Sequence, residues 1–459
     1  MRFSWLLVMC VSGAAVAADP FGVMTRALPS PAAELRPTAA CETAGASGAL
    51  TLAHAVERAL CANPATRSAW LTARLRAAEL GQAESAYLPE VSLSARLARS
   101  GDDLLPNDRS AWQLGLEAQY LLYDFGGRPA RREAAEALLA AARASHDASV
   151  RTLYLQTVVA YFSLAAAQGA VVAAREAETS ALEALKAATA RLQAGTGIPV
   201  DRLQAKTVHA QREIERIRAE GEVARLRGEL AALMGDVGQS AWSLADDEVA
   251  FAQAIDPAAV DTLIEAARSR RPEFRAAEAT LLAREAGVRS AKADGKPRLS
   301  AFLSADRRDS GGLALNDTTL GVSVAVPLFT GFRNTYQIAA AQTQADLARV
   351  ERDRVANQIA LEVWRAYYRL QSETEADRRS ADLVASAAEA ARLALGRYEA
   401  GFGLLLDVLS AQANLAQARQ GQLQTRLGLR VARAELAQAI GELSWAWMEA
   451  ADQNQEGIR

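Results

Sequence analysis

The sequence offers few of the residues that catalysis and metal binding require. Only three histidines occur among its 459 residues, and none of them, His54, His146 or His209, has a partner at the spacing of a metal site. No P-loop, GxSxG motif or dinucleotide-binding glycine pattern is present. A net charge of −3 also lacks the excess of basic residues that nucleic-acid binding needs. We therefore expect no enzyme, no cofactor, no metal site and no nucleic-acid partner.

Aromatic residues are also sparse, whereas small apolar residues are abundant. Aromatic residues make up 6% of the chain and apolar residues 50%, and much of the apolar part is alanine. Alanine favours helix and adds little bulk to a core. After the N-terminus we find no apolar run of about 18 residues, which argues against a bundle of membrane-spanning helices. The composition indicates long helices that pack closely.

Residues 1–18 are typical of a secretory signal peptide. Arg2 supplies the positive start, an apolar stretch begins at Phe3, and Ala15 and Ala17 form the small-residue cleavage pattern. We therefore expect the mature protein to be exported.

The cysteines of the exported chain form a candidate disulfide. Cys10 lies inside the apolar stretch behind Met9, where a lipid-anchored cysteine would need a small residue. Cleavage leaves Cys41 and Cys61, and in an oxidising compartment such a pair is a plausible bridge, with two free thiols as the alternative. The bridge would attach a loose leader, residues 19–50, to the first helix.

The remaining chain contains two copies of one unit, at 51–235 and 258–441, joined by a linker at 236–257 and followed by a tail at 442–459. Matches early in the units lie 208 residues apart and later ones 206 apart. Pairs that match at the first spacing include Pro64 and Pro272, Arg67 and Arg275, Thr72 and Thr280, Arg76 and Arg284, and Pro89 and Pro297. A register kept over about 175 residues indicates an internal repeat.

Each unit is predicted to contain two strands, at about 91–99 and 112–123 in the first copy and at about 299–306 and 318–329 in the second. Polar loops, Ser100 to Ser110 and Asp306 to Asp317, are expected between them. Alternation with a period of two places apolar residues on one face of the strands. The predicted lipid-facing residues are Trp112, Leu114, Leu116, Tyr120, Leu320, Val322, Val324 and Val326.

This length and alternation match a membrane β-barrel strand, and the alternative is a small soluble hairpin packed on helices. One chain offers only four such strands, whereas about eight are needed to enclose an interior. Open strand edges are not tolerated in lipid. If the strands span a membrane, several chains must combine them, and three chains would supply twelve.

A very long helical stretch follows each strand pair, at 128–194 and at 333–400. Each is nearly free of proline and glycine, and about 67 residues at 1.5 Å per residue give a rod of about 100 Å. Glycine-containing turns at 194–200 and 400–406 end these rods. A second helix then follows each turn, at 200–233 and 406–440.

These features together resemble the TolC family of outer-membrane channel-tunnels, which serve efflux pumps and type I secretion systems. The resemblance covers essentially everything after residue 50. It is carried by the duplicated unit, by the segment Leu121 to Arg128 with its counterpart Val326 to Arg333, and by the two turns. Those turns run from Arg191 to Gly197 before Asp201, and from Arg397 to Gly403 before Asp407.

The resemblance implies a mainly α chain with a small membrane β component, in a homotrimer. Its 12-stranded β-barrel, four strands per chain, would lie in the cell outer membrane among lipid and continue into a 12-helix α-barrel in the periplasm. The implied partners are a periplasmic adaptor (membrane fusion) protein and an inner-membrane ABC or proton-driven transporter.

The implied function is passive conduction of substrate from that pump to the outside, in type I protein or toxin secretion or in drug efflux. The alternative is a soluble periplasmic coiled-coil scaffold or adaptor with a small β-hairpin domain. The absence of a lipid-anchored cysteine favours secretion-type members, and the similarity extends to the cyclolysin-type secretion branch.

Four glycines at the two turns suit tight backbone angles, and the resemblance implies that the adaptor docks there. They are Gly195, Gly197, Gly401 and Gly403. Asp201 and Asp407 follow the turns, and three-fold symmetry would convert each into a carboxylate ring that attracts cations at the periplasmic entrance. The alternative role of each is to favour the helix dipole in the first turn.

Tyr398 matches the family's tip tyrosine, whose contacts to a neighbouring helix help to hold the entrance shut. The sequence departs from the family at two places. Gly403 stands where some members carry an arginine of that clasp, and Ser410 stands where they carry a second aspartate. The entrance is therefore expected to be latched more weakly, or in a different way.

Overall fold

The computed structural model describes residues 19–27, 49–102, 105–236, 242–245, 260–310 and 313–443. The chain divides into two compact units. Unit 1 takes Met1–Ser30, Ala69–His146 and Pro272–Val355, and unit 2 takes Pro31–Ser68, Asp147–Arg271 and Ala356–Arg459. The predicted signal peptide, Cys41, and most of the predicted linker and tail lie outside the described residues.

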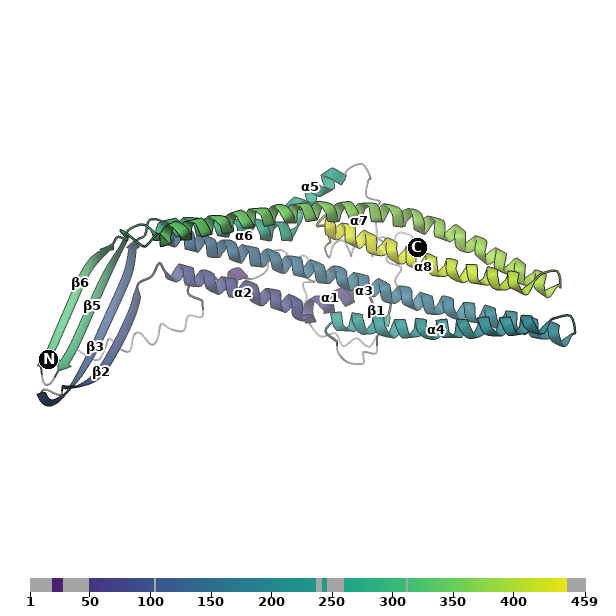
Figure 1. Cartoon of the computed structure of the whole chain (residues 1–459), viewed down its shortest axis with the longest axis horizontal. Helices are drawn as coiled ribbons and strands as arrows, with labels where there is room; N and C mark the ends of the chain where they lie inside the picture. Colours follow the sequence, from purple (N-terminus) through teal and green to yellow (C-terminus); the bar gives the residue numbers. More distant parts are fainter. Residues whose placement is uncertain are drawn as a thin grey trace. The chain divides into compact units, whose positions relative to one another are not determined.

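Long helices and one four-stranded sheet make up most of the described chain (Figure 1). The elements of the first repeat and its preceding segment are η1 (Thr25–Ala27), β1 (Ala49–Leu50), α1 (Leu52–Ala62), α2 (Pro64–Ser85), β2 (Glu90–Asp102), β3 (Leu105–Tyr123), α3 (Gly127–Gln193) and α4 (Pro199–Leu233). Those that follow are β4 (Ser243–Leu244), α5 (Val260–Arg270), α6 (Pro272–Asp294), β5 (Arg298–Ser310), β6 (Leu313–Ala325), α7 (Arg333–Glu399) and α8 (Leu405–Ala439).

Local signals set the starts of the shorter helices. Thr51 caps α1, because its side chain accepts a hydrogen bond from the backbone N–H of His54. Pro64 and Pro272 occupy the first positions of α2 and α6, where the missing proline N–H costs nothing. The two predicted rods are also confirmed, since α3 and α7 each contain 67 residues.

The sheet of unit 1 has the order β2-β3-β5-β6, and every neighbouring pair is antiparallel. The strands are longer than the sequence predicted, and the predicted loops are wrong. Asp102 pairs with Leu105 at one hairpin end and Ser310 with Leu313 at the other. Backbone pairing continues where the apolar alternation stops, because ladder hydrogen bonds do not depend on side-chain polarity.

The second copy also ends its last strand earlier than predicted. β6 stops at Ala325, so Val326 lies beyond it and is not a strand residue. Pro327 explains the early end, since proline lacks the N–H that a ladder needs and restricts the residue before it.

Unit 2 buries its largest hydrophobic cluster where α1, α3, α4 and α8 meet. Tyr154 and Leu230 are fully buried there, and the Tyr161 hydroxyl donates to the Leu50 carbonyl at 3.1 Å. The middle of α3 is apolar and long enough to cross a membrane, contrary to the expectation from the sequence. The hydrophobic cluster of unit 2 takes many of its residues from α3, among them Tyr154 and Tyr161. A single apolar helix that contributes to a buried core is weak evidence for a membrane span.

Candidate functional site

One face of the sheet is apolar and exposed along all four strands. The register aligns Val91, Ala118, Leu303 and Leu320 in one row across the sheet. The exposed large apolar residues on β2 and β3 are Val91, Leu93, Leu97, Trp112, Leu114, Leu116, Tyr120 and Leu122, and those on β5 and β6 are Leu303, Leu320, Val322 and Val324. A soluble protein rarely exposes such a continuous stripe, whereas a membrane barrel does.

Aromatic residues mark both ends of this face. Trp112 and Tyr120 lie eight positions apart on β3, about 27 Å at 3.4 Å per residue. A membrane β-barrel has an apolar band about 25 Å tall between two aromatic girdles. At the Trp112 end the face also carries charge, because Asp309 pairs with Trp112 and Arg307 pairs with Leu114, with the Arg307 guanidinium 5.9 Å from the indole centroid.

The opposite face of the sheet is polar. The Gln113 amide donates to the Asp306 carboxylate at 3.0 Å, and the Ser94 hydroxyl donates to the Gly115 carbonyl at 3.3 Å. A Cβ on Gly115 would lie only 2.8 Å from Asp306 Oδ1, so glycine leaves room for these side chains. Such a face suits the aqueous interior of a barrel.

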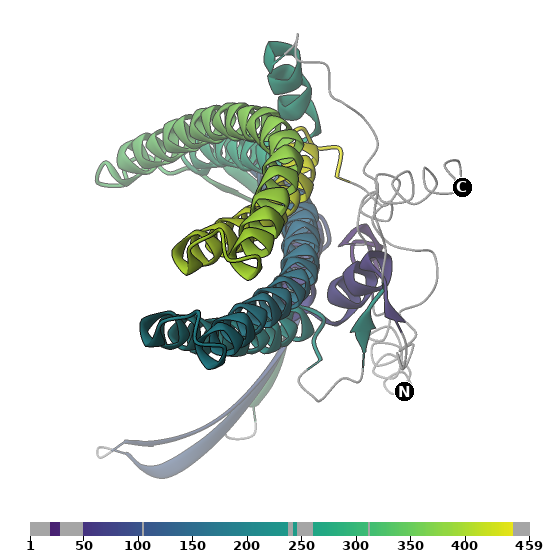
Figure 2. The same ribbon diagram turned by 90° about the vertical axis from the view of Figure 1, so that its right-hand side faces the viewer.

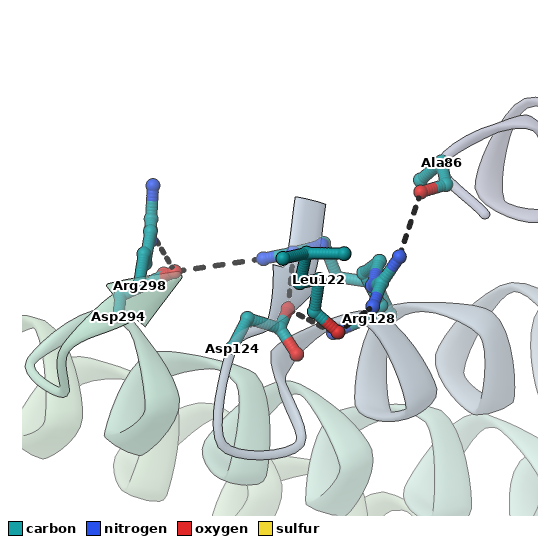
Figure 3. A network of polar contacts seen from close by, with 7 residues as sticks. Ala86, Leu122, Asp124, Arg128, Asp294 and Arg298 are labelled. Carbon is teal, nitrogen blue, oxygen red and sulfur yellow. Dashed lines mark hydrogen bonds and ion pairs between the residues drawn. The ribbon is translucent and has the colours of Figure 1, made fainter. Parts of the chain in front are cut away.

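A buried polar network joins β3 to α3 in unit 1 (Figure 3). The Asp124 carboxylate is 5% exposed, accepts the Arg128 N–H at 2.6 Å and pairs with the Arg131 guanidinium at 3.1 Å. The Arg128 guanidinium in turn donates to the carbonyls of Leu122 and Ala86. The network fixes the direction in which the strand enters the helix. The sequence did not predict this network, because Asp124 and Arg128 were considered there only as part of the segment that resembles the TolC family.

Both tip turns in unit 2 use two glycines for different reasons. Gly195 and Gly401 have φ of +74° and +88°, a region that side chains strain. Gly197 and Gly403 instead lie against the end of the preceding helix, where a Cβ would be 2.8 Å and 3.0 Å from backbone nitrogens. The backbone N–H groups of both Thr196 and Gly197 donate to the Arg191 carbonyl and so close the first turn.

The two tips meet through a small buried cluster in unit 2. Tyr398 of α7 is 1% exposed, and its hydroxyl lies 3.4 Å from the Asp201 carboxylate of α4. Burial, followed by the neighbouring Asp201 charge, raises the pKa of Tyr398 above its ordinary value. The structure thus brings together two of the three predicted entrance residues. The third, Asp407, is exposed in the first turn of α8 and has no side-chain partner in the part of the chain described.

Arg191 completes this contact and was not singled out from the sequence. Its guanidinium lies 4.6 Å from the centre of the Tyr398 ring and donates to the Tyr398 carbonyl at 3.0 Å. Gly403 supplies no side chain that could contact Tyr398. The cation beside Tyr398 comes instead from the last turn of α3.

Two further predicted features concern cysteine and metal. Cys61 is disulfide-bonded, and its predicted partner Cys41 lies outside the described residues. Within the described ranges, no group of three or more His, Cys, Asp or Glu side chains could hold a metal ion.

Comparison with known proteins agrees with this geometry. The family model described as outer membrane efflux protein matches residues 55–236 and 263–442. Protein CyaE of Bordetella pertussis is 31% identical over 407 residues, which cover 86% of this chain and 84% of that protein. Outer membrane efflux protein BepC of Brucella suis biovar 1 is 25% identical over 401 residues, 86% of each chain. The crystal structure of CusC shares the fold, with a TM-score of 0.78 at 20% identity over 88% of this chain and 98% of that one.

Proposed function

Because this chain belongs to the outer membrane efflux protein family, we propose that three copies of it form one exit duct served by a periplasmic adaptor and an inner-membrane pump. The chain is an outer-membrane channel of the TolC family with a periplasmic helical extension. The predicted family, fold class and non-enzymatic transport function are confirmed. The copy number, the partners, the entrance and the cargo are proposals.

One observation carries the joining of several copies into one barrel. The sheet has two open edges, β2 and β6, and an exposed apolar face. In lipid every backbone N–H and C=O group must be paired, and four strands cannot close on themselves. Pairing β6 of one copy with β2 of the next removes all edges, and three copies then supply twelve strands. CusC, whose solved structure shares this fold, forms a transmembrane channel, and the resemblance to the TolC family supplies the number three.

We assign the entrance to the tip cluster of Tyr398 and Asp201, and adaptor docking to the glycine turns. The turns present compact, conformationally fixed backbone at the end of each helical pair. Rings of Asp201 and Asp407 around a three-fold axis would attract cations there.

We place the cargo among proteins or toxins of type I secretion and not among small drugs. CyaE, at 31% identity, is more similar than BepC, whose name describes an efflux protein. The pump would then be an ABC transporter. The test is deletion of the gene in its native host, followed by measurement of secreted protein and of drug susceptibility. Loss of a secreted protein with unchanged susceptibility supports this cargo, and the reverse contradicts it.

The barrel is tested by placing a charge on each face of β3. Leu116 lies midway between Trp112 and Tyr120 on the apolar face, and Gln119 lies on the polar face of the same strand. An arginine at the bilayer midplane of a barrel costs about 2–4 kcal/mol. We expect Leu116→Arg to reduce the heat-modifiable trimer in outer-membrane fractions severely, and Gln119→Arg to leave it near the parent level. Equal trimer yields from both variants would contradict the lipid-facing assignment.

A further inference from the structure

Two arginines share one level of the register on the polar face of the sheet, near the hairpin ends of the strands. Arg96 of β2 lies opposite Gln113 of β3, and Gln113 lies opposite Arg308 of β5. Both arginines are exposed, and neither has a hydrogen bond or an ion pair among the residues that the structure describes. Two positive side chains thus flank Gln113 without a compensating acid.

A row of carboxylates lies next to the arginines on the same face. Asp306 of β5 lies opposite Asp317 of β6, and Asp306 is two residues farther from the hairpin end than Arg308. At 3.4 Å per residue, the two rows are about 7 Å apart along the strands. Like charges directly opposite each other destabilise an antiparallel pair. The pair of Asp306 and Asp317 therefore costs stability and is not needed to hold the sheet together.

The arginine row and the carboxylate row do not neutralise each other. Arg308 and Asp306 lie on one strand and one face, yet no ion pair joins them in the part of the chain described. The Asp306 carboxylate instead accepts a hydrogen bond from the Gln113 amide at 3.0 Å. The guanidinium groups of Arg96 and Arg308 therefore remain available to a ligand.

In the trimer proposed above, the polar face lines the interior of the barrel. The β2–β3 hairpin curves along its length (Figure 2), as a strand pair in a barrel wall does. Because β2 follows α2 and β3 leads into α3, the hairpin end lies away from these helices (Figure 1). The arginine row thus lies toward the outer mouth and the carboxylate row toward the helical duct. Three copies, each with two arginines and two of these aspartates, would form bands of both charges around the lumen.

We propose that Arg96 and Arg308 form an anion-binding site inside the barrel, and that its ligands are small anions with linked phosphate groups. The proposal rests on the proposed trimer, because only there is the polar face enclosed. Neighbouring strands are about 4.8 Å apart, so about 10 Å separates the two arginine backbones across β3. A guanidinium binds phosphate through two parallel hydrogen bonds. Linked phosphates can therefore engage both arginines, whereas a chloride ion satisfies only one.

The acidic residues nearby give this anion site a direction. Beyond the aspartates, the polar face carries Glu117 and then Glu90 toward the helices, and both are exposed. Rings of acidic side chains favour cations in a pore, whereas rings of arginine favour anions and phosphates. A phosphate anion that enters from the outer mouth meets the arginines first, but one that comes through the helical duct must first pass the carboxylates. The site therefore holds anions that enter from outside and offsets the cation preference of the acidic rows.

Block of single channels in planar bilayers tests the site. The purified trimer is titrated with sodium tripolyphosphate in each chamber in turn, and the parent should be blocked at a lower concentration from one chamber than from the other. Arg96→Gln with Arg308→Gln should raise the lower half-blocking concentration about tenfold, the equivalent of about 1.4 kcal/mol. Arg307→Gln is the matched control, because Arg307 lies beside Arg308 but on the apolar face of β5, and it should leave the block unchanged.

Two results of the block experiment would count against different claims. Equal block in the parent and in the double glutamine variant would overturn the anion site. A parent protein that forms no trimer and no channel would instead overturn the proposed function.

Ion selectivity gives a second readout that needs no blocking anion. In a potassium chloride gradient, Arg96→Gln with Arg308→Gln should shift the reversal potential toward that of potassium. Asp306→Asn with Asp317→Asn should shift it toward that of chloride and reduce the difference in block between the two chambers. An unchanged reversal potential in the assembled glutamine variant would overturn the effect of the arginines on selectivity.

A lysine variant separates phosphate binding from charge alone. Arg96→Lys with Arg308→Lys keeps both positive charges but loses the paired hydrogen bonds of the guanidinium. We expect the parent reversal potential and a weaker tripolyphosphate block. Block equal to that of the parent would overturn the phosphate site, and this result decides the matter even where the glutamine variant does not assemble.

Discussion

The two repeats of this channel share one backbone but differ in the side chains that fix it. At the junctions of strand and helix, two successive residues have positive φ in each copy. They are Phe125 and Gly126 at +53° and +93°, and Gly331 and Phe332 at +61° each. The phenylalanine and glycine have exchanged places, while the backbone has kept its shape.

The side chains around these junctions differ more. The first junction has the buried Asp124 network, whereas the matching positions of the second are Thr330 and Asn334. The first repeat also carries the bonded Cys61, where the second has Ser269. The second repeat alone supplies the tip tyrosine. The two repeats thus share one backbone path, whereas different side-chain contacts stabilise it in each copy.

The largest expected difference in stability between matching positions of the two repeats lies at Cys61. A disulfide that closes a loop of about 20 residues contributes about 3 kcal/mol, mainly by restricting the unfolded chain. We expect Cys61→Ser to lower the stability of unit 2 by about this amount. The measurement is denaturant unfolding of the detergent-purified protein, with Ser269→Ala as the matched control. Equal midpoints for Cys61→Ser and the parent would show that the bridge contributes nothing, and mass spectrometry of unreduced peptides would identify Cys41 as the partner.

The next largest effect separates the two junctions. Asp124→Ala removes a charge-assisted hydrogen bond to the Arg128 N–H and a pairing with Arg131, which should cost about 2–3 kcal/mol. Thr330→Ala changes the matching position, where no side-chain bond is made in the described structure, and should cost less than about 0.5 kcal/mol. Thermal dissociation of the trimer measures both. Similar losses in the two variants would mean that the junctions are equally fixed.

Much of this molecule could be predicted from its sequence because its signals are periodic and local. Alanine-rich stretches that are nearly free of proline predicted both 67-residue helices, and the alternation from Trp112 to Leu122 predicted the apolar strand face. The tip glycines fell at turns because only glycine fits there.

What escaped prediction depends on partners far away in the chain or on the backbone alone. The Asp124 carboxylate contacts Arg128 and Arg131 of α3. The Arg128 guanidinium donates to the Ala86 carbonyl, and no residue spacing in the sequence predicts that contact. Arg191 contacts Tyr398 across 207 positions. The strands continue past their apolar alternation, so their ends near Asp102 and Ser310 carried no side-chain signal.

A moderate loss of stability, equal in the two repeats, is expected at the junction glycines, where the two backbones agree. Gly126→Ala and Gly331→Ala each place a Cβ on a residue with positive φ, which costs about 1–2 kcal/mol. Open space surrounds both positions, so strain and not collision sets the cost. The same unfolding measurement should give matching losses within about 0.5 kcal/mol. A loss confined to one junction would show that the shared backbone path matters to only one copy.

The smallest expected effect is on channel conductance and arises at the tip, where only the second repeat supplies a tyrosine, Tyr398, that can ionise at high pH. The pKa of Tyr398 is raised by burial and then by Asp201. A raised pKa means that the neutral phenol is favoured in the closed tip, so its contribution is complete below the ordinary tyrosine pKa of about 10. That contribution is lost as the pH rises through the raised value, because a phenolate would face the Asp201 carboxylate. We expect channel conductance to rise modestly above pH 10 in the parent protein and to rise less in Tyr398→Phe. An identical rise in both would assign the pH effect to other groups and leave the tyrosine without a role in closing the tip.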